Sequence, residues 1–451
     1  MGEPSAHIAV PSGAAQVMEL LERAGYEAYI VGGCVRDVLL GREPADFDIT
    51  TSARPEQVKA VMDAAGVATA DTGLAYGTVS VLYGGAAYET TTYRADGAYT
   101  DGRHPDSVEL LSSIEGDLAR RDFTVNAMAY RPGTGLVDLF GGREDLVAGT
   151  LRSVGCAHER FEEDALRIMR GVRFAAQLGF AVEPVTADAM HADAGLLSRV
   201  SAERLAAELL KLVCAPHALA PLLEFADVLA VFMPEIEASI GFEQHNVHHV
   251  YTVWEHCART CCAAPADDAA MRLAALMHDI GKPSCFAMGA DGQGHFYGHR
   301  EASAELFSQL AARLKLPRAL ARDVGTLVRY HDAALPSTQA GWRRWAVKFG
   351  PEGVARILEL HRYDIAALAP AEVEAGLAGV DAACAAFEQA IADVRVFSVA
   401  DLAIDGNDVM AAGVEAGPAV GRVLSQLLDD VVAGTLANER AALLARAAEL
   451  A

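Results

Sequence analysis

The sequence predicts an α/β head with a small mixed sheet over residues 1–150, followed by domains built from helices alone. Short apolar runs of strand length alternate with helical segments and glycine turns between residues 14 and 94. From about Phe161, the apolar residues recur with the period of a helix almost to the end of the chain. A chain of 451 residues also exceeds the length at which one hydrophobic core keeps growing, so we expect several domains.

The elements of the head are predicted from local patterns in chain order. Residues 14–25 form an amphipathic pattern that Gly25 ends, and AYIVGG is typical of a buried strand that enters a glycine turn. Gly41 ends the next short helix in the same way. The expected order is helix 14–25, strand 28–33, helix 35–41, strand 46–50, helix 53–66, and strands 77–83 and 86–94.

Four domains are expected from the changes in pattern along the chain. The head covers residues 1–150, and a helical neck follows over residues 151–240. A histidine-rich helical domain covers residues 241–370, and a helical tail covers residues 371–451. The stretch from Pro234 to Gly241 marks the boundary before the histidine-rich part.

The charge balance argues against a protein that coats nucleic acid without specificity. The chain has 37 Lys and Arg residues against 61 Asp and Glu residues, a formal net charge of −24. Phosphate contacts require clustered cations. Arginines are nevertheless concentrated between residues 120 and 173, so we expect a local basic surface that holds one end of an RNA.

Neither a membrane protein nor a secreted protein is expected. No apolar stretch approaches the roughly 20 residues that cross a bilayer, and the N-terminus lacks the apolar core of a secretory signal. The eight cysteines are scattered without a CxxC pair, which is typical of a reducing compartment rather than a disulfide framework. We therefore expect a cytoplasmic protein whose cysteines are ordinary core or surface residues.

Two aspartates behind a glycine turn are the first candidates for catalysis. Gly32 and Gly33 follow a predicted strand. Asp46 and Asp48 flank Phe47 in the next strand, so both carboxylates are expected on one face. Two carboxylates this close repel unless cations lie between them, and such ligands suit Mg²⁺ with a triphosphate, in a two-metal site. Taken alone, each feature is also typical of an ordinary turn or a solvated strand edge.

In combination, these motifs resemble the superfamily of class II tRNA nucleotidyltransferases and bacterial poly(A) polymerases. The superfamily pattern GG, RD, LLG and DFD is matched, in order, by Gly32, Gly33, Arg36, Asp37, Leu39, Leu40, Gly41, Asp46, Phe47 and Asp48. The resemblance implies a polymerase-beta-like nucleotidyltransferase head in which Asp46 and Asp48 hold the catalytic Mg²⁺. It also implies that Gly32, Gly33 and Arg36 face the triphosphate of the incoming nucleotide.

Later segments of the head extend the resemblance. RRDFTVNAMAY is similar to a family motif, which implies that Arg121, Asp122 and Asn126 contact the ribose and phosphates of the nucleotide. From the residues alone, Arg121 and Asp122 also fit a surface ion pair. Glu89 is a candidate third acid near the metals, although a solvated strand residue is equally expected. The polar stretch Tyr93–Val108 resembles a loop that the family uses when it adds a terminal A.

An arginine stripe in the neck is a candidate base-reading surface. Four residues spaced by three are expected on one face of a helix: Asp164, Arg167, Arg170 and Arg173. An Asp acceptor beside an Arg donor can recognise the Watson–Crick edge of C or A, although the spacing also fits an exposed helical salt bridge. Glu163, Asp164 and Arg167 resemble the family's EDxxR motif, which implies a protein template that selects CTP and then ATP.

Histidines are concentrated in residues 241–370, where their pattern predicts a metal site. A lone histidine is more often an ordinary core or surface residue than a ligand, but here an HD pair ends a predicted helix. The region resembles an HD phosphohydrolase domain, and the residues that match its metal ligands are His256, His278, Asp279 and Asp364. His299 and His331 match the extra histidines of HD domains with a second metal, so phosphoester hydrolysis is a secondary hypothesis. This mixed ligation suits a divalent metal whose identity the sequence does not fix.

The resemblance as a whole predicts template-independent addition of the 3′-terminal CCA to tRNA, with CTP and ATP as substrates. An A-adding tRNA nucleotidyltransferase and a poly(A) polymerase are alternatives that share the head motifs. The acidic C-terminus favours the tRNA enzyme, because bacterial poly(A) polymerases usually end in a basic extension. Hypotheses of another class are an HD phosphohydrolase with an inactive head and a non-catalytic RNA-binding protein, and the intact Asp46 and Asp48 argue against both. The sequence does not fix the oligomeric state.

Overall fold

The computed structural model divides the chain into two units. The first runs to Glu237 and includes Arg313–Leu316, and the second comprises Ala238–Ala312 and Pro317–Ala451. The change of unit lies within the stretch from Pro234 to Gly241, and the finer division into four domains stays a prediction. The residues described are 8–74, 77–96, 108–110, 113–247 and 249–451. Within these ranges, no helix has the length and apolar character needed to span a bilayer.

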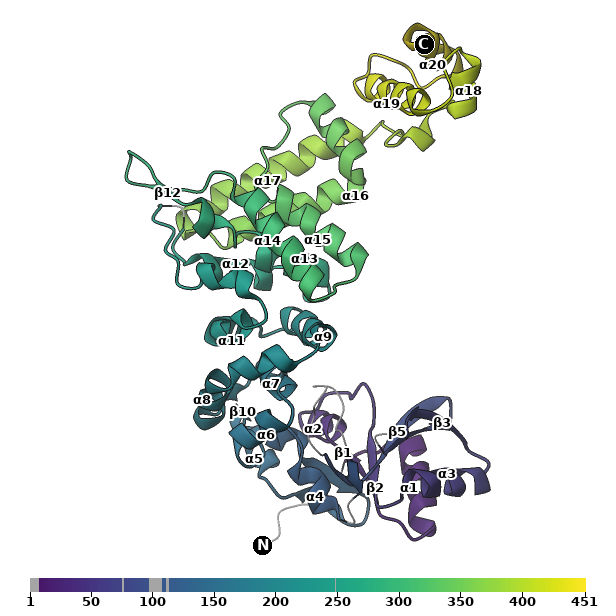
Figure 1. Cartoon of the computed structure of the whole chain (residues 1–451), viewed down its shortest axis with the longest axis vertical. Helices are drawn as coiled ribbons and strands as arrows, with labels where there is room; N and C mark the ends of the chain where they lie inside the picture. Colours follow the sequence, from purple (N-terminus) through teal and green to yellow (C-terminus); the bar gives the residue numbers. More distant parts are fainter. Residues whose placement is uncertain (1–7, 75–76, 97–107, 111–112, 248) are drawn as a thin grey trace. The chain divides into compact units, whose positions relative to one another are not determined.

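A seven-stranded mixed sheet forms the centre of the head (Figure 1). The interior strand β1 (Ala28–Val31) is buried along its whole length and pairs with β2 (Ile49–Thr51) and β8 (Met128–Arg131). β2 pairs in parallel with β5 (Ala86–Thr92), whereas all other neighbouring strands of this sheet pair antiparallel. The strand order is β3-β4-β5-β2-β1-β8-β9, with β3 at Ala68–Gly73, β4 at Thr78–Tyr83 and β9 at Gly135–Asp138. The predicted α/β head with a small mixed sheet is confirmed.

Helices cover both faces of this sheet. α1 (Ser12–Arg23) and α3 (Pro55–Ala64) pack on one face. α4 (Ile114–Ala119) covers the other face, where Ile114 and Leu118 pack against Tyr29 and Val31. α2 (Gly33–Leu39) follows β1 directly. α1, α2 and α3 match the predicted helices within a few residues, because each has an amphipathic stripe and a glycine or proline at one end, whereas α4 was not predicted.

Two features of the head differ from the sequence prediction. Asp46 and Asp48 precede β2, which begins at Ile49, so the expectation that both lie within a strand is wrong. The backbone is already extended at Asp48, whose carbonyl oxygen accepts from the Val31 amide at 3.0 Å, but pairing with β5 begins only at Ile49. β3, β8 and β9 were not predicted.

The neck is helical and is organised around α7 (Leu166–Leu178). α7 is buried on most of its surface, including Ile168, Met169 and Val172, and it packs against α9 (Ala202–Val213). The head ends with α5 (Gly142–Ala148), and the remaining neck helices are α6 (Ala157–Glu163), α8 (Pro184–Ala192), α10 (Leu219–Glu224) and α11 (Ala226–Ala230). The expected helical character after the head is confirmed, with two short exceptions: the parallel pair β10 (Thr150–Leu151) and β11 (Ala181–Val182), and a hairpin in the second unit.

The second unit is built from helices and one short hairpin. Its first part contains α12 (Val253–Ala263), α13 (Ala269–Met277), β12 (Ala287–Met288), β13 (Gly294–His295), α14 (His299–Arg313), α15 (Arg318–Tyr330), α16 (Gln339–Ala366) and α17 (Pro370–Ile391). α16 bends at Gly350, which has a left-handed φ of 72° and precedes Pro351. The last helices α18 (Gly406–Ala411), α19 (Pro418–Val432) and α20 (Arg440–Leu450) enclose a separate core around Leu427 and Leu443.

Candidate active site and metal centre

The paired aspartates of the head lie beside a third carboxylate. Asp46 and Asp48 are exposed at the entry to β2, and Glu89 projects from the neighbouring strand β5. Desolvation by the surrounding protein, followed by the charge of Asp46, raises the pKa of Asp48 to about 6, while Arg121 opposes this shift and Glu89 adds to it. A raised pKa means that the surroundings of the carboxylate contain too little positive charge to stabilise its ionised form. This cluster of carboxylates therefore favours a bound cation.

Asp48 and Glu89 line a cleft of about 350 Å³, a volume in the range of small-molecule sites. The other charged residues of its wall are Asp122, Asp164, Arg94, Arg120, Arg121, Arg167, Arg170 and Arg204. Carboxylates beside β2 and β5 together with six arginines suit a ligand that carries both a metal ion and phosphate groups. The structure therefore joins head residues and neck residues in one cleft.

Gly32 allows an arginine to lie directly on the turn after β1. Its φ of +81° is in the left-handed region, and a Cβ there would lie 2.9 Å from Nη1 of Arg121. Nη2 of Arg121 donates to Oδ2 of the buried Asp117 at 3.1 Å, which fixes the guanidinium beside the turn. Of the residues predicted to face a triphosphate, Gly32 and Arg121 are thus brought together.

Arg36 and Asn126, by contrast, do not line the cleft. Nη1 of Arg36 donates to Oδ1 of Asn126 at 2.6 Å, and both side chains are buried. Nδ2 of Asn126 donates to Oδ1 of Asp122 at 3.2 Å, and Nε of Arg170 donates to Oδ2 of Asp122 at 2.7 Å. The four residues therefore form one network, which connects α2 in the head to α7 in the neck.

Asp122 is the ionised centre of this network. Burial alone would raise the pKa of Asp122, but the Arg170 guanidinium and the Asn126 amide lower it to about 2. The Phe123 amide also donates to Oδ1 at 2.8 Å. Asp122 is therefore a largely buried charged residue at the wall of the cleft, held by donors from both parts of the first unit, and it is more than a surface ion pair.

The expected helical stripe of Asp164 and three arginines is interrupted. Asp164 lies between α6 and α7 in an extended conformation, so it does not share a helix face with the arginines. Oδ1 of Asp164 accepts from the Leu166 amide at 3.1 Å and thereby caps α7. Aspartate favours such caps over helix interiors, which explains the break. Asp164 and Arg167 still line the same cleft.

The arginines of α7 are held by different partners. Nη1 of Arg167 donates to Oε2 of Glu163 at 2.6 Å, and its Nη2 donates to the Arg120 carbonyl at 2.8 Å. Arg173 is buried, pairs with Glu208 of α9 and does not line the cleft. The structure therefore places Arg167 and Arg170 at the cleft, and it places Arg173 in the packing between α7 and α9.

Arg204 is a cleft residue that the sequence analysis missed. It projects from α9, and its Nη2 donates to Oδ2 of Asp164 at 2.9 Å. The two residues are 40 positions apart, and Arg204 belongs to an ordinary amphipathic helix, so no local signal marks it. Asp164 is thus fixed at both oxygens, by a backbone amide at one and by a guanidinium at the other.

The stretch expected to help add a terminal A is described only at its two ends. β6 (Arg94–Asp96) pairs antiparallel with β7 (Val108–Leu110). Residues 97–107, which include Gly97 and Gly102, lie outside the described part of the chain, so this prediction stays open.

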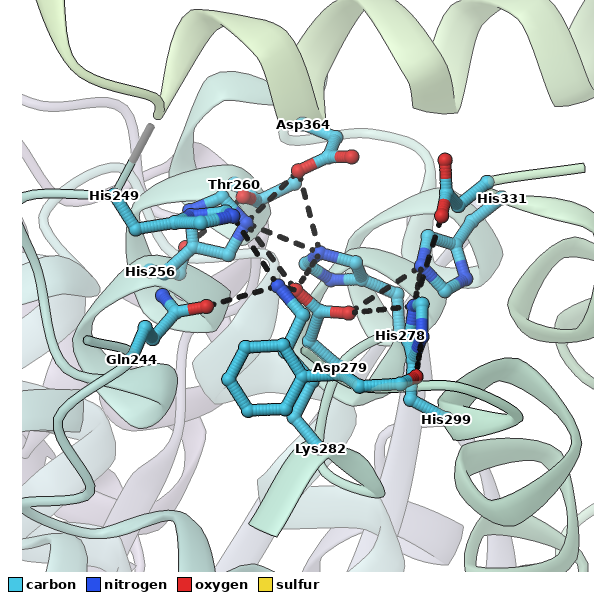
Figure 2. A network of polar contacts seen from close by, with 12 residues as sticks. Gln244, His249, His256, Thr260, His278, Asp279, Lys282, His299, His331 and Asp364 are labelled. Atoms are coloured by element: carbon cyan, nitrogen blue, oxygen red, sulfur yellow. Dashed lines mark hydrogen bonds and ion pairs between the residues drawn. The ribbon is translucent and has the colours of Figure 1, made fainter. Parts of the chain in front are cut away.

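All six residues predicted as HD ligands converge in the second unit (Figure 2). Within each of two groups, the candidate ligand atoms lie within 4.8 Å of one another. The first group is His256, His278, Asp279 and Asp364, and the second is Asp279, His299 and His331. Asp279 belongs to both, because its Oδ2 lies 3.3 Å from Nε2 of His278 and its Oδ1 lies 3.3 Å from Nε2 of His331.

Backbone carbonyls orient the four imidazoles of this centre. Nδ1 lies 2.6 Å from the Ala275 oxygen in His278 and 2.8 Å from the Val328 oxygen in His331. In the same way, Nδ1 of His256 faces the Ala367 carbonyl oxygen, and Nδ1 of His299 faces the Phe296 carbonyl oxygen. Donation from Nδ1 leaves Nε2 as the acceptor. Two Nε2 atoms then face each other at 3.3 Å (His256 and His278) and at 3.2 Å (His299 and His331), an arrangement that requires a cation or a proton between them.

The charges around Asp279 also fit a cation. Oδ1 of Asp279 is buried without a hydrogen-bond donor in the described part of the chain. Burial disfavours a charged imidazole, yet Asp279 raises the pKa of His278 well above its ordinary value. Imidazole nitrogens with carboxylate oxygens are a donor set for divalent transition metals. The residues present therefore fit a metal ion in each group.

Lys282 and Gln244 extend this centre and were not predicted. Nζ of the buried Lys282 lies 2.6 Å from Oδ2 of Asp279 and donates to Oε1 of Gln244 at 2.9 Å. Lys282 follows the HD pair by three residues in the same sequence motif, so its position was available from the sequence. Gln244 reaches the centre from a distant loop, which local sequence does not reveal.

Three family models match the chain. The Poly A polymerase head domain matches residues 28–152, and the RNA and SrmB-binding site of polymerase A matches residues 179–240. The model for tRNA nucleotidyltransferase domain 2 matches residues 299–447. His256, His278 and Asp279 lie between the second and third matches.

Known proteins resemble the chain over nearly its full length. A CCA-adding enzyme of Lacticaseibacillus paracasei is 35% identical over 450 residues, which cover 99% of this chain and 97% of the relative. A CCA-adding enzyme of Streptococcus pyogenes is 51% identical over 201 residues, which cover 45% and 49% of the two chains. The crystal structure of the Bacillus stearothermophilus CCA-adding enzyme in complex with CTP is 30% identical, with a TM-score of 0.73 over 98% of both chains. The Thermotoga maritima enzyme complexed with tRNA shares the fold at 20% identity, with a TM-score of 0.56 over 97% and 94% of the two chains.

The geometry around Asp279 leads to a prediction for metal binding. We expect Asp279→Asn to remove both divalent ions from the second unit, because this carboxylate is shared by both ligand groups. His331→Gln should remove one ion and leave the other. The measurement is bound Mn²⁺ per chain by elemental analysis after dialysis, for the parent and each variant.

Asp291→Asn is the matched control, because Asp291 is an exposed carboxylate of the same unit outside both groups. It should bind as much Mn²⁺ as the parent. Equal metal content in Asp279→Asn and in the parent would contradict the assignment.

Proposed function

This chain belongs to the CCA-adding enzymes, a family of tRNA nucleotidyltransferases, and we propose that its head cleft carries out the addition of C, C and A to the 3′ end of tRNA from CTP and ATP. The observation that supports this assignment of the site is the crowding of Asp46, Asp48 and Glu89 at a cleft lined by six arginines. Such a cleft provides ligands for cations and donors for phosphate oxygens in one place.

Asp46 and Asp48 would hold Mg²⁺, because hard oxygen ligands suit this ion and the raised pKa of Asp48 marks a deficit of positive charge. When bound, Mg²⁺ supplies Lewis-acid activation of the attacking 3′ hydroxyl and neutralises charge on the departing pyrophosphate. Arg121 at the Gly32 turn provides donors to the triphosphate from a position fixed by Asp117. The remaining catalysis is positioning of substrate groups within the cleft.

We propose that Asp164, Arg167 and Arg204 select the incoming base. Asp164 can accept from the exocyclic amino group that C and A share and that U lacks, and Arg167 provides a donor beside it. Arg204 binds Oδ2 of Asp164 and so fixes the direction of the remaining lone pairs. Discrimination between bases then depends on the fixed orientation of the Asp164 carboxylate, which accepts from a base with an amino group and cannot rotate to accommodate a base without one.

A second proposal concerns the histidine centre. Its carboxylates and imidazoles fit two divalent ions that share Asp279, and we propose that it hydrolyses phosphoesters such as 2′,3′-cyclic phosphates. When bound, such ions supply activation of water and stabilisation of charge on the phosphate. Lys282, which is buried beside Asp279, would keep the excess negative charge of the ligand set low.

We propose a cytoplasmic location, which accords with the cysteine chemistry. All eight cysteines lie within the described residues, and none of them forms a disulfide. A reducing compartment maintains thiols in that state.

The nucleotidyltransferase assignment predicts the length of the product. With Mg²⁺, CTP and ATP, a tRNA transcript that ends at the discriminator base should grow by three residues and stop. Asp48→Asn should lower kcat by about three orders of magnitude, because loss of a metal ligand removes several kcal/mol of transition-state stabilisation. Products are resolved at single-nucleotide length by gel electrophoresis.

The control for this assay is Asp71→Asn, which changes an exposed carboxylate of the same sheet and should leave the rate unchanged. Growth by one A only from a transcript that already ends in CC would identify an A-adding enzyme. An open-ended ladder with ATP would identify a poly(A) polymerase. Full activity in Asp48→Asn would overturn the two-metal assignment.

The role of Arg204 predicts a loss of base discrimination. Arg204→Ala should reduce the preference for CTP over UTP by roughly tenfold, as expected when a charge-assisted hydrogen bond of about 1.5 kcal/mol is lost. The measurement is the ratio of kcat/KM values for the two nucleotides on a tRNA that lacks CCA. Lys211→Ala, on the same helix and exposed, should keep the parental ratio. An unchanged ratio in Arg204→Ala, even with a lower rate, would show that Arg204 has no part in selection.

The hydrolytic proposal predicts two separable activities. Asp364→Asn should abolish hydrolysis of 2′,3′-cyclic AMP by the Mn²⁺-loaded protein, because it removes a ligand of one group. The same variant should still add CCA to tRNA, because the head cleft is unchanged. Both rates are measured on one preparation by chromatography of products. If the parent hydrolyses no faster than Asp364→Asn, the centre is not a hydrolase for this substrate.

A further inference from the structure

One buried aromatic ring contacts three arginines of the first unit. Phe174 belongs to α7, and only 6% of its surface is exposed. The guanidinium carbon of Arg173 lies 3.7 Å from the centre of this ring, that of Arg170 lies 5.1 Å away, and that of Arg36 lies 5.3 Å away. A cation within about 6 Å of an aromatic face is attracted by the negative charge of that face. Arg170, which lines the cleft, is thus held by a residue that does not line it.

The ring of Phe174 is itself fixed by a residue of the head. Phe123 is fully buried and meets Phe174 edge-on, with ring centroids 6.0 Å apart and an interplanar angle of 79°. Edge-to-face pairs of this kind are a preferred aromatic geometry. Phe123 directly follows Asp122, so the backbone that carries the partner of Arg170 also supports the ring that Arg170 contacts.

Two of the three arginines are held within the protein. Nε of Arg36 donates to Oδ1 of Asp37 at 2.8 Å, in addition to the bond from Nη1 to Asn126. Arg173 pairs with Glu208. Arg36 and Arg173 are both buried, and neither of them lines the cleft.

Arg170 differs from these two because one edge of its guanidinium is free. Nε and Nη2 of Arg170 lie 2.7 and 2.6 Å from Oδ2 of Asp122, which uses two of the five N–H groups. Within the described part of the chain, no other hydrogen-bond acceptor contacts this guanidinium. The side chain is 35% exposed and lines the cleft. With Asp122 on one edge and Phe174 on the face, the remaining donors are left for a ligand in the cleft.

We propose that Phe174 is a positioning residue for the incoming nucleotide, because it holds Arg170 so that the free edge of this guanidinium binds a phosphate group that CTP and ATP share. This inference rests on the proposed function. Asp122, which anchors Arg170, directly follows Arg121 at the Gly32 turn, where the triphosphate is proposed to bind. A guanidinium edge presents N–H groups in a geometry that matches the oxygen atoms of a phosphate.

An aromatic ring suits this role better than a second carboxylate would. A carboxylate would occupy further N–H groups of Arg170 and would weaken its attraction for phosphate, whereas the ring covers only the face of the guanidinium. Restriction of the side chain also reduces the conformational entropy that is lost when the nucleotide binds. Arg170 and Phe174 are four residues apart on one helix, so their contact is local to α7.

The test is Phe174→Leu in the full-length protein, which keeps an apolar side chain and removes the aromatic face. The dissociation constants of CTP and ATP, measured by equilibrium dialysis with Mg²⁺ and without tRNA, should each rise on the order of tenfold. In the complete reaction, KM should rise by the same factor while kcat stays within about twofold, because the contact is lost equally from the ground state and the transition state. Unchanged dissociation constants would overturn the proposal. Weaker binding of only one nucleotide would place the contact at the base and would overturn it as well.

Phe225→Leu is the matched control. Phe225 is a fully buried residue of the neck, and its ring stacks on His191 with centroids 5.1 Å apart. The same atoms are removed from the neck core, so the thermal unfolding midpoint should fall by a similar amount in both variants. Both nucleotides should bind to the control as they do to the parent. Equal weakening of nucleotide binding in the two variants would show that lost packing is responsible, and it would exclude a specific role for Phe174.

A double-mutant cycle tests whether Phe174 acts through Arg170. In the Arg170→Gln background, Phe174→Leu should weaken CTP binding no further, because the guanidinium that the ring holds is absent. Additive losses would exclude action through Arg170. Phe174→Tyr keeps the ring and should bind CTP as the parent does. If Phe174→Tyr binds as weakly as Phe174→Leu while its unfolding midpoint equals that of the parent, a role for the aromatic face is excluded.

Nucleotide binding is measured without chemistry, which separates this proposal from the proposed function. A parent protein that binds CTP and ATP but adds neither to tRNA would contradict the nucleotidyltransferase assignment of the cleft, and the effect of Phe174→Leu on binding would still decide the positioning role. A parent protein that adds CCA, with a Phe174→Leu variant that binds and reacts in the same way, would overturn the positioning role alone.

Discussion

The buried pair of Asp122 and Arg170 is the contact on which the catalytic unit depends. It joins the sheet of the head to the central helix of the neck, and its carboxylate also accepts from Asn126, which in turn holds Arg36. The lowering of the Asp122 pKa from 3.8 to about 2 corresponds to about 2 kcal/mol of stabilisation, fully present above pH 3.8 and lost as the pH falls through 2. Loss of Arg170 would leave the buried Asp122 carboxylate without its guanidinium, at a cost of about 3–5 kcal/mol.

This contact explains why several polar and charged residues of the head and neck bind one another rather than line the cleft. Arg36 and Asn126 match motif positions and Arg173 continues the stripe of α7, yet the side chains of all three bind other protein groups. A cleft that recognises a base by hydrogen bonds needs side chains in fixed positions. Networks of charged hydrogen bonds fix the direction of these side chains, which apolar packing does not do. The consequence is that much of the positive charge of this region lies in ion pairs with protein carboxylates, which fix the guanidinium groups at the cleft.

The sequence was sufficient for the elements whose signals are local. Helices α1, α2 and α3 and strands β1, β4 and β5 were predicted from apolar period and glycine position, and the six candidate metal ligands that converge in the second unit were predicted from their resemblance to an HD motif. The sequence was insufficient where tertiary contacts decide. Asp164 leaves the helix because it caps α7, and Arg204 meets it across 40 residues. The burial of Arg173 likewise depends on Glu208 of a later helix, which no spacing rule within one segment can reveal.

The two proposed metal sites differ in ligand chemistry, and this difference allows one chain to use both. Asp46, Asp48 and Glu89 offer oxygen atoms alone at an exposed cleft, a set that favours Mg²⁺ arriving with a nucleotide. The histidine centre offers four imidazoles oriented by backbone carbonyls and shares a carboxylate that is buried, a set that favours a resident transition metal. An ion bound to the imidazoles of the second unit would therefore not compete with the Mg²⁺ proposed for the head. The type of ligand at each proposed site, rather than affinity for one shared ion, would keep the two chemistries separate.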